Sequence, residues 1–140
     1  MWNLDDQTEY IKVHAFTMPK AFTYGDTRPG HTDKDKREDI RAKAAESFPT
    51  NIPKFKSWAF RIIVKKTGGR QIDIDNVPKL IVDAFCTLQI QKDSSKYKNL
   101  CLFKKDTLDY VKIIEVGGMR SQEVDTIEVE IFGHRSLTLA

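Results

Sequence analysis

The sequence predicts a single domain of the α/β class, on the border of α+β, with a mixed sheet of about four strands and two main helices. Two observations lead to this prediction. Segments with strand-like apolar patterns alternate with segments of helical period, in the order β-α-β-α-β-β. The 140 residues, 40% hydrophobic and 31% charged, have the length and composition of one globular domain. No internal repeat divides the chain, so we expect residues 1–140 to fold as one unit.

The first half of the chain predicts two strands with a helix between them. Residues 9–17 alternate well enough for a strand. Thr32 or Asp33 is a suitable N-cap for a helix that Pro49 ends, and the apolar stripe of this helix is thin. Residues 58–64 are apolar at nearly every position, which is typical of a strand in the centre of a sheet. The stripe of the helix consists of Ile40, Ala44 and Phe48.

The second half contains the clearest helical pattern, which begins after Asn76, a good N-cap, and has Pro78 in its first turn. The lysine-rich residues 89–105 have weak patterning and are expected to form a long loop. Strands are expected at 108–116, ending at a glycine pair, and at 126–132, as an edge strand or one with a solvated side. The helix has one continuous apolar stripe, formed by Val77, Leu80, Ile81, Ala84, Phe85 and Leu88.

Several classes of protein do not fit this sequence. No apolar run approaches the roughly 20 residues that span a bilayer. The N-terminus has neither the basic nor the apolar region of a signal peptide. We therefore expect a cytoplasmic protein without membrane contact, in which Cys86 and Cys101 are reduced. The net charge of +3 is mildly basic and does not by itself indicate a nucleic-acid-binding protein.

The most informative stretch is Asp73-Ile74-Asp75, immediately before the second helix. In an extended segment residues i and i+2 lie on one face, so the two carboxylates would converge. Like charges that close require a cation, and oxygen ligands favour a hard divalent ion. Lys79 adds a positive charge suited to a phosphate, so the group indicates phosphodiester chemistry. The alternative is that both aspartates are turn residues before a capped helix in an interaction module.

Basic residues flank this stretch on both sides. Either cluster alone is compatible with a solvated loop, and Lys79 with Asp83 is compatible with an ordinary helix pair or with Asp83 positioning Lys79. Around an acidic site, however, lysines suit a DNA backbone. The candidate DNA contacts are Lys65, Lys66 and Arg70 before the motif, and Lys92, Lys96, Lys98, Lys104 and Lys105 after it, where Asp93 is the one acid.

With its motifs placed in this way, the chain resembles the RusA family of Holliday junction resolvases. The family signature is Asp-x-Asp-Asn, two variable positions and Lys, leading into a helix with a further Asp. Here it reads Asp73-Ile74-Asp75-Asn76-Val77-Pro78-Lys79, followed by Asp83, and the resemblance covers about residues 9–132. Members are small homodimeric, magnesium-dependent endonucleases that resolve four-way DNA junctions.

The resemblance implies roles for individual residues of this chain. Asp73 and Asp75 would hold Mg²⁺, for which Mn²⁺ would substitute, and Lys79 would assist at the phosphate. A third acid normally comes from an acidic pair before a strand, and here lysine replaces the first of the pair. Asp106 is then the expected third ligand and Asp109 the runner-up, after a longer connecting stretch than the family has.

The expected function is resolution of four-way DNA junctions by paired symmetric nicks, carried out by a homodimer. Two alternatives keep nucleic acid as the partner. A relative that has lost one ligand would bind branched DNA and cut nothing. A metal nuclease acting on RNA, flaps or other structured nucleic acid would carry the same motif.

Overall fold

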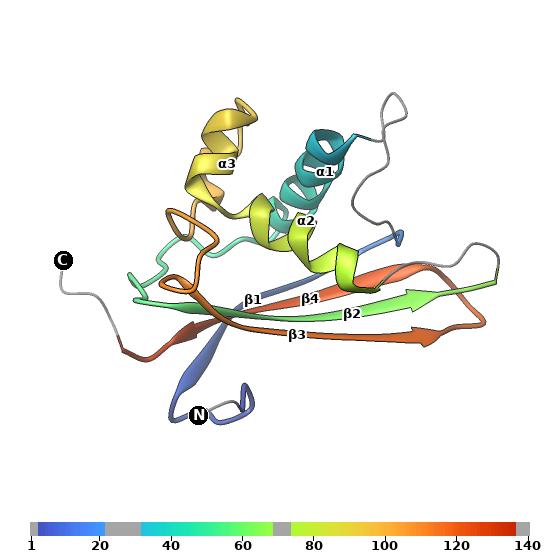
Figure 1. Ribbon diagram of the computed structural model, residues 1–140, viewed down its shortest axis with the longest axis horizontal. Coiled ribbons are helices and arrows are strands. Elements are labelled where there is room, and N and C mark those ends of the chain that lie inside the picture. The colour runs from blue at the N-terminus through green and yellow to red at the C-terminus, as the bar shows by residue number, and fades with distance from the viewer. Residues whose placement is uncertain (1–2, 22–31, 69–73, 137–140) are drawn as a thin grey trace.

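The computed structural model describes residues 3–21, 32–68 and 74–136, and it confirms the predicted fold class. One four-stranded sheet is covered on one face by helices (Figure 1). None of the helices in these ranges has the length and apolarity needed to span a bilayer. The elements, in which η denotes a short 3-10 helix, are β1 (Tyr10–Met18), α1 (Asp33–Ala45), β2 (Trp58–Lys66), η1 (Ile74–Asn76), α2 (Val77–Ala84), α3 (Thr87–Lys92), η2 (Lys98–Leu100), β3 (Val111–Arg120) and β4 (Thr126–His134).

The sheet has the strand order β1-β4-β2-β3. β4 pairs antiparallel with β1 and β2, whereas β3 pairs parallel with β2. The interior position predicted for β2 is confirmed. β4 has the predicted one-sided burial, because Ile127, Val129 and Ile131 are buried while the glutamates between them are half-buried. It is not an edge strand, because it pairs with β2 along one edge and with β1 along the other.

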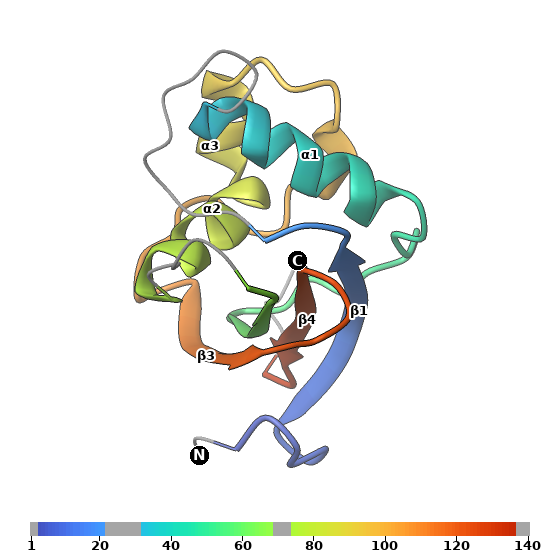
Figure 2. The ribbon, with the colours of Figure 1, turned by 90° about the vertical axis from the view of Figure 1, so that its right-hand side faces the viewer.

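The main core lies between the sheet and the helices, which occupy a single layer (Figure 2). Phe60, Ile62 and Val64 of β2 face this layer in register with Ile131, Val129 and Ile127 of β4. From the helices, α1 contributes Ile40 and Ala44, and α2 contributes most of its predicted stripe. The buried residues of α2 in this core are Val77, Leu80, Ile81, Val82 and Ala84. Burial of these two apolar stripes is the main reason why the short helices are stable.

α1 begins as the sequence predicts. Thr32 is its N-cap, and its hydroxyl accepts a hydrogen bond from the backbone N–H of Asp35. The Asp35 carboxylate accepts from the backbone N–H of Thr32 in return, which completes a capping box. Asn76, by contrast, makes no side-chain cap, because the chain enters α2 through the 3-10 turn of η1.

The predicted helix after Asn76 is shorter than its apolar stripe. α2 ends at Ala84, and Leu88 is 43% exposed on a separate helix, α3. The carbonyl groups that would continue α2 have tertiary partners instead. Arg41 Nε donates to Ala84 O at 2.7 Å, and the N–H of Leu102 donates to Phe85 O at 3.0 Å. A continuous helix would use both carbonyl groups for its own hydrogen bonds, so the helix ends there although the apolar stripe continues.

Two further expectations require correction. Residues 89–105 are not one long loop, since they contain most of α3 and all of η2. β3 begins three residues later than predicted and continues through the glycine pair to Arg120, paired with β2. The glycines do not end it, because Gly117 and Gly118 pair in register with Ile63 and Val64 of β2. An added Cβ at Gly118 would lie 2.9 Å from Cδ1 of Ile74 in η1.

Candidate functional site

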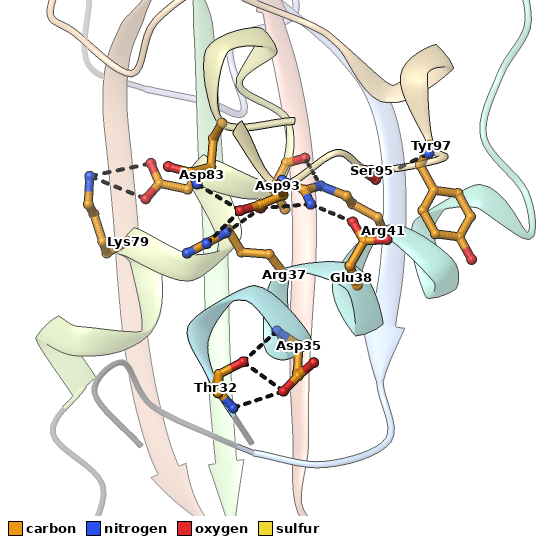
Figure 3. Close-up of polar contacts among 12 residues, drawn as sticks. Thr32, Asp35, Arg37, Glu38, Arg41, Lys79, Asp83, Asp93, Ser95 and Tyr97 are labelled. Atoms are coloured by element: carbon orange, nitrogen blue, oxygen red, sulfur yellow. Dashed lines mark hydrogen bonds and ion pairs between the residues drawn. The ribbon is translucent and has the colours of Figure 1, made fainter. Parts of the chain in front are cut away.

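Lys79 and Asp83 of α2 form a polar cluster with Asp106. The Nζ atom of Lys79 lies 3.3 and 3.2 Å from the two carboxylate oxygens of Asp83 (Figure 3). The same Nζ lies 2.8 Å from Oδ2 of Asp106, which is 27 residues further along the chain. One ammonium group therefore joins two carboxylates that come from different elements.

The helix and the segment before β3 position these three side chains. Lys79 and Asp83 are one turn apart on α2, so they share a face. The side chain of Lys79 is 52% exposed and that of Asp106 is 35% exposed, whereas Asp83 is buried. Asp83 is thus the inner anchor of the cluster, and the other two groups are accessible to a ligand.

The local environment shifts the pKa values of the Asp83 and Asp106 carboxyl groups in opposite directions. Burial, together with a hydrogen bond to Asp106, raises the pKa of Asp83 to about 6, although Lys79 acts in the opposite direction. A hydrogen bond from Lys79 keeps the pKa of Asp106 below its usual value. The hydrogen bond to Asp106 also raises the pKa of Lys79, which remains an ammonium. The cluster therefore offers an ionised carboxylate, a cation and a carboxyl group that titrates near neutrality.

The described residues include only part of the predicted Asp73-Ile74-Asp75 motif. Asp73 and Arg70 lie outside the described residues. Asp75 is exposed and belongs to η1, the turn that leads directly into α2. The strand-like alternation expected for this segment is therefore wrong at Asp75, because Ile74–Asn76 has 3-10 geometry. Within the described ranges, no three His, Cys, Asp or Glu side chains form a group that could hold a metal ion.

The two candidates for the third acid occupy different environments. Asp106 pairs with Lys79, as described above. Asp109 is exposed in the turn that precedes β3 and forms no hydrogen bond or ion pair with any residue in the described ranges. The late start of β3 is the reason, since Asp109 lies before the strand rather than within it. The geometry thus groups Asp106, and not Asp109, with the lysine of the motif.

The predicted DNA contacts also divide into two groups. Lys65 pairs with Glu128 at 3.0 Å, and Lys66 pairs with Asp125 at 2.9 Å. The five lysines from Lys92 to Lys105 are all exposed, and none forms an ion pair with an acid in the described part of the chain. The structure therefore separates lysines of β2 that have ion-pair partners from lysines of residues 92–105 that have none in the described ranges.

A buried ionic cluster beside this site was not predicted. Asp93, at the end of α3, accepts hydrogen bonds from Arg37 Nε at 2.7 Å and Arg37 Nη2 at 2.9 Å. Arg41 Nη1 lies 3.0 Å from the same carboxylate and 2.6 Å from Glu38 Oε1 (Figure 3). Arg41 has no exposed surface, and Gln89 donates a further hydrogen bond to Asp93. This cluster fastens α3 to α1.

The ionisation of Asp93 follows from these partners. Burial alone would raise the pKa of Asp93, but hydrogen bonds from Arg37, Gln89 and Arg41 outweigh burial and lower it. The sequence contained a weak signal for this cluster. Arg37 and Arg41 are four residues apart on one helix, and Asp93 is the single acid of a lysine-rich stretch.

Comparison of the chain with protein-family models, with curated proteins and with solved structures finds no match. The resemblance to the RusA family therefore depends on the motif itself and its flanking residues. The positions of Lys79, Asp83 and Asp106 are an independent structural observation beside it.

Proposed function

We propose that the protein is a Mg²⁺-dependent endonuclease that resolves four-way DNA junctions by paired symmetric nicks. The observation that carries the proposal is the contact between Lys79 and Asp106. The RusA-like motif supplies two acids and a lysine from one short stretch, whereas a third acid has to come from a distant segment. Asp106 is the residue with the expected place in the sequence, and it lies beside the lysine of the motif.

The donor chemistry of these residues fits a magnesium ion. Asp106 has a lowered pKa and a partly exposed side chain, and Asp75 is exposed in η1, the turn before α2. Hard divalent cations prefer carboxylate oxygens of this kind. Asp73, Asp75 and Asp106 would hold the metal, which when bound supplies polarisation of the phosphate and activation of water.

Lys79 would act on the phosphate directly. Its ammonium remains charged, because its hydrogen bond to Asp106 raises its pKa. Asp83 binds Lys79 through both carboxylate oxygens and so restricts where the ammonium can lie. If Asp106 holds the metal, Lys79 would be available to neutralise the charge that develops on the phosphate.

A four-way junction has approximate two-fold symmetry, and two strands must be cut. One active site on each subunit of a two-fold dimer would meet this requirement. The proposal therefore includes a homodimer in which each copy supplies one complete set of Lys79, Asp83 and Asp106.

The test uses a labelled synthetic four-way junction, a matched linear duplex and a flap, each with Mg²⁺ or EDTA. We expect symmetric nicks in the junction alone, lost in EDTA and in an Asp75→Asn variant. The control is Asp39→Asn, which removes an exposed acid of α1 and should cut normally. Cleavage that persists in EDTA, or cleavage of no substrate with any metal, would contradict the proposal.

A second candidate function is binding of branched DNA without cleavage. It is favoured by the ion pair itself, since Lys79 neutralises the carboxylate that a metal would use. Lys105, in place of an acid beside Asp106, adds positive charge at the same point. Tight junction binding with no cut in Mg²⁺ or Mn²⁺ would support this candidate, and preferential cutting of the flap would indicate another structured substrate.

A further inference from the structure

Three lysines of β1 and β2 have carboxylate partners on β4 or directly before it. Lys12 forms an ion pair with Glu130, Lys65 with Glu128, and Lys66 with Asp125. For a phosphate to bind such a lysine, the existing pair has to break, and a carboxylate then remains close to the phosphate. Both effects oppose binding, so this surface is a poor DNA contact although its lysines are numerous.

The segment 92–105, which we name the lysine cap, has the opposite character. Its five lysines are exposed and have no acid partner in the described ranges, and Lys96 lies only over the ring of Tyr97, at 5.3 Å. The lysines of the cap are Lys92, Lys96, Lys98, Lys104 and Lys105.

The one acid of the cap does not offset this charge at the surface. Asp93 is buried, and its carboxylate is directed into the cluster with Arg37 and Arg41 (Figure 3). The acid that would otherwise repel a phosphate is therefore neutralised inside the protein. The exposed surface of the cap carries positive charge only.

The cap has a defined shape and adjoins the candidate site. Leu100 and Phe103 anchor it in the core, and the N–H of Leu88 donates to Lys104 O. Its backbone returns beside the junction of α2 and α3, because the N–H of Thr87 donates to Phe103 O. Lys105 then directly precedes Asp106. In Figure 1 the cap lies with α3 at one end of the helical layer and leads down to β3.

We infer that the lysine cap is the main surface by which the protein holds the DNA backbone next to the candidate site. This inference rests on the proposed function, because it takes DNA as the partner. Free lysines on a preformed surface bind phosphates with release of counterions and without loss of an internal ion pair. The paired lysines of β1 and β2 have a smaller part in DNA binding.

The test compares two triple variants that remove the same charge. The cap variant is Lys92→Gln/Lys96→Gln/Lys98→Gln, and the matched control is Lys12→Gln/Lys65→Gln/Lys66→Gln. Dissociation constants for the labelled four-way junction are measured in EDTA over a range of salt concentrations, and cleavage is measured separately in Mg²⁺. Thermal melts establish that both variants are folded.

We expect the cap variant to bind at least about tenfold more weakly, with a salt slope smaller by about 2 to 3, and the control to bind within about twofold of the wild type. Equal weakening in both variants, no weakening in the cap variant, or no junction binding by the wild type would each overturn the inference. Cap-dependent binding without cleavage would support the inference and contradict the proposed nuclease function. Cleavage with binding that does not depend on the cap would support the proposed nuclease function and contradict the inference.

Discussion

The ammonium group of Lys79 lies 2.8 Å from the carboxylate of Asp106, a residue 27 positions further along the chain. Lys79 belongs to the first turn of α2, and Asp106 belongs to the segment that leads into β3. Between them the chain forms α3 and the lysine cap and then returns to α2. The contact between the lysine and the acid therefore joins two segments that are separated by α3 and the lysine cap.

Asp83 makes the stability of the fold depend on pH. Its pKa in the folded state, about 6, is above the unfolded value, so its favourable contribution is complete below about pH 4 and is lost as pH rises through 6. We expect the unfolding free energy of the wild type, relative to Asp83→Asn, to fall by about 2 kcal/mol between pH 4 and pH 7.5. Urea titrations of both proteins across this range measure the difference, and parallel curves would refute it.

Asp93 neutralises two arginines inside the helical layer. Asp93→Asn removes the ion pair of Arg37 and one of the two ion pairs of Arg41, which has no exposed surface. We expect this variant to lose about 3 kcal/mol of unfolding free energy. The control is Glu46→Gln, which breaks the exposed pair with Lys43 and should cost less than about 0.5 kcal/mol. Similar stabilities for the two variants, measured by urea unfolding, would show that the buried cluster is not important for folding.

Two strand glycines give a matched test of the packing. An added Cβ at Gly133 would lie 2.3 Å from the ring of Phe55, which is buried against Trp58. We expect Gly133→Ala to cost about 1–3 kcal/mol, because the ring has to move. At Gly117 nothing lies within 4 Å of the added atom, so Gly117→Ala should stay within about 0.5 kcal/mol of the wild type. Thermal unfolding that affects both variants equally would contradict this packing.

The order of the elements could be predicted from the sequence because each main segment has a distinct periodicity. The apolar run of β2 and the alternation of β4 indicated a central and a one-sided strand. Thr32 and Asp33, the two candidate N-caps, indicated the start of α1, and Thr32 is the N-cap. These signals are local, and the structure retains them.

The break between α2 and α3 could not be predicted in this way, since the apolar stripe continues to Leu88. The helix ends because Arg41 and Leu102 bind carbonyl groups that are distant in sequence. The burial of Arg41 also depends on a residue that is distant in sequence. Its charge is neutralised by Glu38 on the same helix and by Asp93, which comes from the end of α3.

In the candidate site, too, local contacts could be predicted from the sequence and long-range contacts could not. Lys79 and Asp83 could be paired from their spacing on one helix. No periodicity relates Asp106 to Lys79, and its choice over Asp109 came from the resemblance to the RusA family. In the structure Asp106 contacts the lysine, whereas Asp109 lies in the turn before β3.

The most direct test of a nuclease site at Lys79 and Asp106 is the single-turnover rate of junction cleavage in Mg²⁺ by the wild type, Asp106→Asn and Asp109→Asn. Both variants remove one carboxylate charge from the same segment, and junction binding in EDTA shows that each still holds its substrate. We predict a loss of at least about 100-fold for Asp106→Asn and a rate within about twofold of the wild type for Asp109→Asn. An unchanged rate for Asp106→Asn, or a larger loss for Asp109→Asn, would contradict the assignment.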